Sequence, residues 1–251
     1  MIPSPIRRVL SSIQTHQVQA LLMGGQACVL YGAAEFSRDT DLAILAAAEN
    51  LQRLQNALAE LQGERIAVPP FELRYLEMGL AVHFRCRLAE CAGMRIDIMA
   101  KMRGVAPFAD LWARRTTIES DQSSLDLLSL PDLVQAKKTQ RDKDWPVITR
   151  LVEASYFHQR LKPTPSLAEF WLRELRTPQL LIDVASEHAA QAHALSGQRA
   201  AVAAALGGYQ ALATVAREVQ AEQDREREAD RQYWRPLKKE LERLRREARS
   251  E

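Results

Sequence analysis

One stretch of sequence decides the fold of this 251-residue chain: Gly24-Gly-Gln-Ala-Cys-Val-Leu-Tyr-Gly-Ala-Ala-Glu-Phe-Ser-Arg-Asp-Thr-Asp-Leu42. The apolar run 19–23 before it predicts a buried strand that ends in a glycine turn. Residues 26–31 predict a short helix, and residues 40–45 alternate before turning apolar, as expected for a second strand. The stretch therefore predicts a strand, a tight turn, a helix and a strand.

Asp39 and Asp41 lie two residues apart at the start of the second predicted strand. Successive side chains of a strand point to opposite faces, so these two carboxylates share one face. Mg²⁺ prefers oxygen ligands and combines one or two carboxylates with substrate phosphates. Gly24 and Gly25 would let the backbone approach those phosphates, and the helix that follows favours an anion at its N-terminus. The stretch predicts a site for a metal and a phosphate.

Asp97 is the third carboxylate that we expect at this site, from an alternating stretch farther along the chain. Ile96 and Ile98 point to the opposite face, toward a core, where an isolated charge is costly unless it is paired or bound to a metal. Three carboxylates with two metal ions can activate an acceptor hydroxyl and neutralise phosphate charge. The predicted catalytic and metal-binding residues are Asp39, Asp41 and Asp97, with Mg²⁺ or Mn²⁺ as the cofactor.

The patterns along the chain change character near Pro131. Before it, strand-like and helical segments alternate, and after it long helical patterns fill the chain. The polar residues 121–124 and a proline suited to a first helical turn place the boundary between the two parts. We expect an α+β fold, with a mixed sheet and helices over residues 1–125 and an all-helical domain over residues 126–251. Further strands are predicted at 81–88 and 94–99, and helices at 6–16, 49–61 and 71–78.

The C-terminal tail is predicted to be a charged helix with one apolar stripe. Leu237, Leu241, Leu244 and Ala248 follow a spacing of four, three and four residues. Two heptads are too few for an independent coiled coil. We expect the stripe to dock on the body of the protein, with a partner protein as the alternative.

Composition excludes several classes of protein. The 34 basic and 32 acidic residues give a net charge of +2, too small for a general attraction to nucleic acid. The chain has no apolar run of about 18 residues and no secretory signal pattern, so we expect a cytoplasmic protein with no membrane partner. Three cysteines at irregular spacing predict no disulfide framework. A zinc site at His83, Cys86 and Cys91 lacks a fourth ligand, so these are interpreted as packing residues.

The layout resembles the nucleotidyltransferase superfamily, and within it the abortive-infection (AbiEii-like) toxin nucleotidyltransferases. The resembling elements are the Gly-Gly-x-Ala turn, Gly32, Ser37-x-Asp39-x-Asp41-Leu42, Asp97, Leu130-Pro-Asp-Leu-Val-Gln-Ala-Lys-Lys138 and Arg141-Asp-Lys-Asp144. The resemblance implies that the three carboxylates bind Mg²⁺ and that a lysine and an aspartate on the first helix after the sheet contact the nucleotide. By position these are Lys137 and Asp144, with Lys138 and Asp142 as alternatives. Ser37 is either a phosphate ligand or a turn cap.

The resemblance implies transfer of a nucleoside monophosphate from a nucleoside triphosphate such as ATP to an acceptor hydroxyl. Toxin–antitoxin and phage-defence systems use such enzymes, so a cognate antitoxin or toxin is the expected protein partner. We expect an RNA or tRNA end as the acceptor, partly because residues 95–115 carry five basic residues against two acidic ones. The alternatives are transfer to a protein side chain and a non-catalytic binding module of the same fold.

Overall fold

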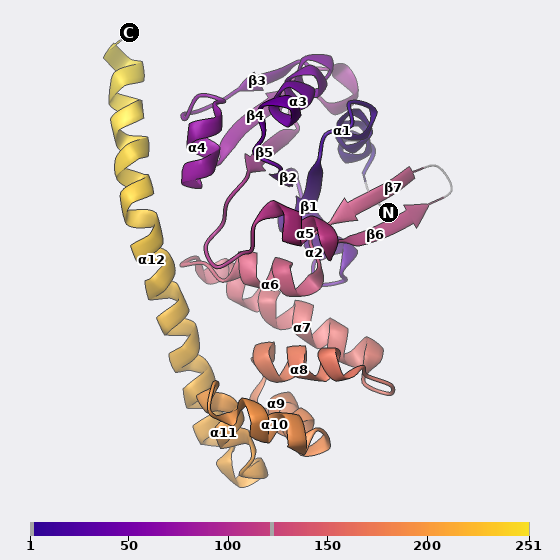
Figure 1. Ribbon diagram of the computed structural model, residues 1–251, viewed down its shortest axis with the longest axis vertical. Helices are drawn as coiled ribbons and strands as arrows, with labels where there is room; N and C mark the ends of the chain where they lie inside the picture. The colour runs from indigo at the N-terminus through magenta and orange to yellow at the C-terminus, as the bar shows by residue number, and fades with distance from the viewer. Residues whose placement is uncertain (1–2, 121–122, 251) are drawn as a thin grey trace. The chain divides into compact units, whose positions relative to one another are not determined.

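The computed structural model describes residues 3–120 and 123–250, and its described strands form a seven-stranded sheet (Figure 1). The strands run in the spatial order β3-β4-β5-β2-β1-β7-β6. Their bounds are β1 Ala20–Met23, β2 Asp39–Ile44, β3 Gly63–Arg65, β4 Val82–Cys86, β5 Arg95–Met99, β6 Thr116–Ser120 and β7 Ser123–Leu127. The pairs β2–β5 and β1–β7 are parallel and the others are antiparallel. The sheet is therefore mixed, as the expected α+β fold requires.

Apolar side chains on both faces bury the centre of the sheet. Leu21 and Leu22 are consecutive in β1 and point to opposite faces, yet both are fully buried. Ala43 and Ile44 repeat this at the end of β2. A strand covered on both faces is fixed in register, because a slip of one residue would exchange its faces. The carboxylates of β2 and β5 therefore stand on a rigid support.

Five helices lie between the described strands of the sheet or before them. Their bounds are α1 Ser4–Thr15, α2 Gly24–Leu30, α3 Ala48–Glu60, α4 Leu73–Met78 and α5 Phe108–Ala113. α1 buries the apolar stripe that its sequence predicts, including Ile6, Val9 and Ile13, and it packs against α3. The helices predicted at 6–16, 49–61 and 71–78 are confirmed within two residues at each end, and the last of them begins at Leu73.

The hairpin β6–β7 is a feature that the sequence pattern does not predict. Its register pairs Thr116 with Leu127, and Leu127 continues into a parallel pairing with Leu22 of β1. Polar residues dominate both strands, and the only apolar alternation is the short Leu125-Asp126-Leu127 at the end of β7, which is too brief to predict a strand. Asp121 and Gln122, part of the stretch that suggests a domain boundary, lie outside the described residues.

The chain divides into two compact units whose bounds differ from the expected 1–125 and 126–251. The first unit holds the residues up to Leu30, Ala34–Ala136, and the chain from Tyr233 onward. The second holds Tyr31–Ala33 and Lys137–Gln232. The segment after residue 125 stays with the sheet because β7 pairs with β1 and because Asp132 binds Arg114. Whether the units fold as separate domains stays a prediction.

The second unit is helical in its described residues. Its elements are the end of α6 (Leu130–Lys137), η2 Asp142–Asp144, α7 Trp145–Gln159, α8 Pro165–Glu174, α9 Pro178–Glu187, α10 Ala189–Ser196, α11 Ala200–Ala205, η3 Gly208–Ala211 and the first part of α12 (Leu212–Ser250). Trp171 is fully buried, donates a hydrogen bond to Ser155 and meets Tyr156 edge to face at 5.3 Å. None of the described helices is both long and apolar enough to cross a membrane.

The stripe of the C-terminal tail docks on the sheet unit, as expected. Leu237 and Leu244 in α12 are each only 6% exposed and pack with Tyr75 and Leu80. Leu241 is partly buried beside them. The stripe therefore belongs to the core of the first unit, and most of the charged residues of α12 after Tyr233 are exposed.

Candidate active site

Asp39, Asp41 and Asp97 lie on one face of two adjacent parallel strands. The register of β2 and β5 places Asp41 directly beside Asp97, and Asp39 beside Arg95. The intervening residues Thr40 and Ile96 point to the other face and are fully buried. The alternation predicts this shared face, and the pairing adds which carboxylates are neighbours. Their role as metal ligands stays a prediction.

Two glycines before this face leave room for the side chains that follow them. Gly24 adopts a φ of +67°, and a Cβ at this position would overlap the carboxylate of Asp41. A Cβ on Gly25 would lie 2.6 Å from the hydroxyl of Ser37, while the Gly25 N–H donates to Asp41 Oδ2 at 3.3 Å. In this structure the glycines thus make space for Asp41 and Ser37, whereas the sequence predicts that they make space for a phosphate. The Gly-Gly turn and the Ser-x-Asp-x-Asp segment form one local unit.

Asp97 is held by two neighbours on its own face, the guanidinium of Arg95 and the imidazole of His83. Its Oδ1 accepts a hydrogen bond from Arg95 Nε at 2.7 Å and lies 2.8 Å from His83 Nδ1. Burial by itself would raise the pKa of the Asp97 carboxyl, but the contacts with His83 and Arg95 outweigh it and hold the pKa below its ordinary value. Asp97 is therefore charged near neutral pH, as a metal ligand must be.

The donor set on this face suits a hard divalent cation. It consists of carboxylate oxygens, which Mg²⁺ and Mn²⁺ prefer. Both contacts that Asp97 makes with the described residues fall on Oδ1, which leaves Oδ2 for a ligand. Within residues 3–120 and 123–250, however, no three His, Cys, Asp or Glu side chains stand close enough together to form a metal cluster. The residues thus fit the metal in chemistry, and the rotamers of the aspartates would have to adjust to it.

Ser37 acts as a turn residue in this structure. Its hydroxyl donates to the backbone oxygen of Asp39 at 3.2 Å, which closes the turn that leads into β2. This contact fits the turn-cap interpretation of Ser37, and a role as a phosphate ligand stays a prediction. The hydroxyl also lies close to Gly25 of the Gly-Gly turn.

Lys137 and Asp144 lie in the second unit and are brought together there. Lys137 Nζ lies 3.6 Å from Asp144 Oδ1, and Asp144 also accepts hydrogen bonds from Thr139 at 2.6 Å and Arg141 at 2.7 Å. Asp144 is 4% exposed in its side chain, so these contacts compensate a buried charge. A structural role for Asp144 is visible, whereas nucleotide contact by either residue stays a prediction.

The alternative residues Lys138 and Asp142 differ in their surroundings. Lys138 is buried and pairs with Glu174 at 2.7 Å, while Asp142 is 92% exposed in its side chain and pairs with Arg227 at 3.0 Å. A lysine that is already buried against a carboxylate is a poor point charge for a triphosphate. Of the two lysines, Lys137 keeps the weaker ion pair.

Two of the five basic residues in the segment expected to hold RNA are paired with carboxylates outside it. Arg114 forms a two-pronged pair with Asp132 at 2.7 Å for both contacts. Arg115 pairs with Asp126 at 2.9 Å and stacks over Trp112. The count of charges within 95–115 misses these partners because they follow later in the sequence. The charge argument for an RNA surface is therefore wrong for these two arginines.

Comparisons with known proteins show no family for this chain and give a weak likeness to solved structures. Neither the family models nor the curated proteins include a match to this chain. Among solved structures, the chain is similar to one described as the crystal structure of an antigenic nucleotidyltransferase-like protein from Paracoccidioides brasiliensis. The match has a TM-score of 0.35 and 14% sequence identity, and covers 68% of this chain and 93% of that one. A likeness at this level supports no inference about what the chain binds, so the site is judged on its own geometry.

Sequence reasoning missed two members of the site, His83 and Arg95. His83 is interpreted above as a packing residue, but it pairs with Asp97 across the antiparallel strands β4 and β5. Alternation in the two strands contains part of the signal, but the register that places His83 opposite Asp97 depends on the connection through the 3-10 helix η1 (Ala89–Cys91), which the pattern does not predict. Arg95 lies two residues before Asp97 and so shares its face by alternation alone.

Proposed function

We propose that this protein is a metal-dependent nucleotidyltransferase that moves a nucleoside monophosphate from a triphosphate to an acceptor hydroxyl. The observation that carries the proposal is the register of β2 and β5, which sets Asp41 beside Asp97 with Asp39 on the same face. The Gly-Gly turn supports it, because Gly24 leaves room for the Asp41 carboxylate. Carboxylates on one face repel one another, and a divalent cation between them would relieve that repulsion.

The proposed roles follow from where each carboxylate stands. Asp39, Asp41 and Asp97 would hold Mg²⁺ or Mn²⁺, which when bound would neutralise phosphate charge and make the acceptor hydroxyl more acidic. Asp97 would orient the acceptor through Oδ2, while Arg95 and His83 fix its other oxygen. Oδ2 of Asp97 would also accept the proton that the acceptor hydroxyl loses when it attacks.

The reaction balances as a substitution at the α-phosphorus. A bond forms between the acceptor oxygen and the α-phosphorus, the bond from that phosphorus to the bridging oxygen of the β-phosphate breaks, and pyrophosphate leaves. The hydroxyl proton passes to Asp97 and then to water. In this proposal Lys137 is the residue that would contact the triphosphate, as a point charge.

A non-catalytic binding module is the second candidate, and the contacts of Asp97 favour it. The guanidinium of Arg95 already binds Asp97. The hydrogen bond with Asp97 and the charges of Asp39 and Asp41 raise the pKa of Arg95. An internal cation on an acidic face partly takes the place of a metal. A protein that has lost turnover could keep its fold and its partner binding in this way.

A transfer assay separates the two candidates. Wild-type protein is incubated with each α-labelled triphosphate, Mg²⁺ or Mn²⁺, and a cell extract that supplies acceptors. The proposal predicts a labelled macromolecule or small molecule with the wild type and none with Asp41→Asn. Equal labelling by both proteins contradicts the enzyme, and absence of labelling with any of the four triphosphates favours the binding module.

The class of acceptor is read from the same labelled product. The ion pairs of Arg114 and Arg115 weaken the charge argument for RNA, so the proposal extends only to a hydroxyl acceptor. Label that ribonuclease releases would indicate an RNA end such as that of tRNA. Label that only a protease releases would indicate a protein side chain, for instance on a partner toxin or antitoxin.

A further inference from the structure

A cavity in the second unit has a charged lining that the proposed transfer reaction does not use. Its volume is about 340 Å³, and four cationic side chains line it: Lys138, Arg173, Arg199 and Arg225. Three carboxylates, those of Glu174, Glu222 and Glu226, also line it. The lining therefore carries more positive than negative charge before any other residue is counted.

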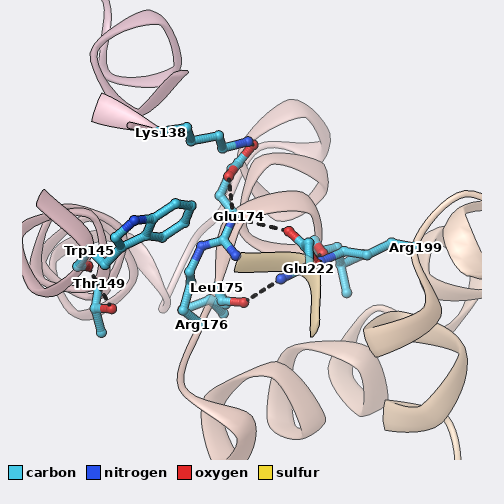
Figure 2. Close-up of polar contacts among 9 residues, drawn as sticks. Lys138, Trp145, Thr149, Glu174, Leu175, Arg176, Arg199 and Glu222 are labelled. Carbon is cyan, nitrogen blue, oxygen red and sulfur yellow. Dashed lines mark hydrogen bonds and ion pairs between the residues drawn. The ribbon is translucent and has the colours of Figure 1, made fainter. Parts of the chain in front are cut away.

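The buried side of this cavity is a chain of alternating charges (Figure 2). Lys138 pairs with Glu174 at 2.7 Å, and Glu174 lies 3.7 Å from Arg176. Arg176 pairs with Glu222 at 3.0 Å, and Glu222 pairs with Arg199 at 2.9 Å. A cation stands at each end, so both carboxylates are shared between cations and the chain keeps one positive charge in excess.

The excess charge is costly because its members are removed from water. The side chains of Lys138, Arg176 and Arg199 are 8%, 3% and 9% exposed. Burial lowers the pKa of Arg199 even though Glu222 and Glu174 act to raise it. A buried charge without a full set of partners is destabilising, so an anion in the adjacent cavity would stabilise this network.

The remaining hydrogen-bonding capacity of the network points the same way. Arg199 Nη1 and Nη2 donate hydrogen bonds to the backbone oxygens of Leu172 and Leu175. These bonds fix the guanidinium at the wall of the cavity. Nε and Nη1 of Arg176 have no hydrogen-bond acceptor among the described residues, and the guanidinium lies 5.0 Å from the ring centre of Trp145. Oε2 of Glu174 is also without a hydrogen-bond donor among the described residues, so the network keeps more unsatisfied donors than acceptors.

At the rim, Arg225 is exposed and has no ion pair with any residue that the structure describes. Arg173, by contrast, is paired with Glu169 at 2.8 Å and contributes little net charge. Guanidinium groups match the oxygens of a phosphate in geometry as well as in charge. We propose that this cavity binds a phosphate group, carried by free phosphate or by a small phosphomonoester.

The test measures binding of inorganic phosphate and of AMP to the full chain by calorimetry, with EDTA present and the ionic strength held constant with NaCl. The wild type is expected to bind one of the two at one site per chain. Arg225→Ala should weaken that binding about tenfold, or ~1.4 kcal/mol. Binding of inorganic phosphate alone would identify a free-anion site, and binding of AMP alone a phosphomonoester site.

The matched control is Arg217→Ala, an exposed arginine on α12 that does not line the cavity. It removes the same charge and should bind as the wild type does. Asp41→Asn should also bind normally, which separates this cavity from the proposed transfer site. Equal weakening by Arg225→Ala and Arg217→Ala, or no binding of either phosphate compound by the wild type, would overturn the proposal.

Discussion

The two carboxylate oxygens of Asp97 differ in their contacts: Oδ1 is bound by neighbouring side chains, and Oδ2 is the one proposed to bind a ligand. Oδ1 receives both Arg95 and His83, and Nδ1 of His83 also lies 3.1 Å from Arg95 Nη2. A ring nitrogen that donates to the carboxylate cannot at the same time accept from the guanidinium. The three side chains therefore have two arrangements of their hydrogen bonds, and both keep Oδ1 occupied.

Gly24 and Gly32 form a natural pair for testing the glycine turn. Both have positive φ, at +67° and +76°, so alanine at either should cost about 1 to 2 kcal/mol of stability. A Cβ on Gly24 would also displace Asp41, whereas one on Gly32 meets nothing within 4 Å. We expect Gly24→Ala to lose binding of Mn²⁺ and Gly32→Ala to keep it, both measured by calorimetry. Equal affinities in the two variants would show that the position of Asp41 is unimportant.

Glu60 should make the stability of the sheet unit depend on pH. Hydrogen bonds from Ser12 and Arg8, and one with His16, lower its pKa from 4.5 to about 2. A carboxyl with a lowered pKa stabilises the folded state above its ordinary pKa, and that contribution fades as the pH falls from 4.5 toward 2. Glu60→Gln should therefore be less stable than the wild type at pH 7, with a gap that narrows toward pH 2.5.

The measurement is urea denaturation at pH 7, 4 and 2.5. Glu49→Gln on the same helix is the control, because Glu49 is 80% exposed and its pair with Arg53 is a surface pair. Its gap to the wild type should stay small at every pH. A Glu60→Gln gap that is constant or widens on acidification would contradict the assigned contacts.

At the scale of elements, the docked stripe of α12 predicts a measurable loss of stability. Leu237 and Leu244 are each 6% exposed and pack on Tyr75 and Leu80. Replacing either with alanine should cost ~2 kcal/mol or more in a denaturant melt. Glu242→Ala, on the exposed side of the same helix, should change little. If the leucine variants kept the wild-type midpoint but formed a smaller oligomer, the stripe would serve a partner.

The elements with strong apolar periodicity could be predicted from the sequence. α1 and α3 show helical spacing of leucine, isoleucine and valine, and β1, β2 and β5 show apolar runs or alternation. The shared face of Asp39 and Asp41 follows from alternation alone. These parts are local, since each depends on residues close together in the chain.

The parts that could not be predicted depend on pairing between distant residues. The hairpin β6–β7 has polar strands, so its existence rests on pairing with β1 through Leu22 and Leu127. Arg114 and Asp132 look like separate surface charges in the sequence, yet they form a close ion pair. The bounds of the compact units follow from such contacts, which local composition does not contain.

For the molecule as a whole, charge pairing predicts that RNA binding is weak and that its affinity depends little on salt concentration. The net charge is +2, and Arg114 and Arg115 are both paired with aspartates. With about two phosphates contacted, the slope on single strands is roughly 1.4, or about sevenfold weaker binding between 50 and 200 mM salt. Fluorescence anisotropy with a labelled single-stranded RNA measures this slope. A slope of roughly 3 or more would show a basic surface that the ion pairs do not neutralise.

The most direct test of the central claim is binding of Mn²⁺, followed by electron paramagnetic resonance with a non-hydrolysable triphosphate present. The proposed function predicts that the wild type binds Mn²⁺ at the face of Asp39, Asp41 and Asp97. Asp39→Asn and Asp41→Asn should each weaken it at least about tenfold, because each removes a ligand charge. Their thermal midpoints in EDTA should equal or slightly exceed that of the wild type, since carboxylate repulsion is relieved. Wild-type affinity for Mn²⁺ in either variant, with the fold intact, would contradict the claim.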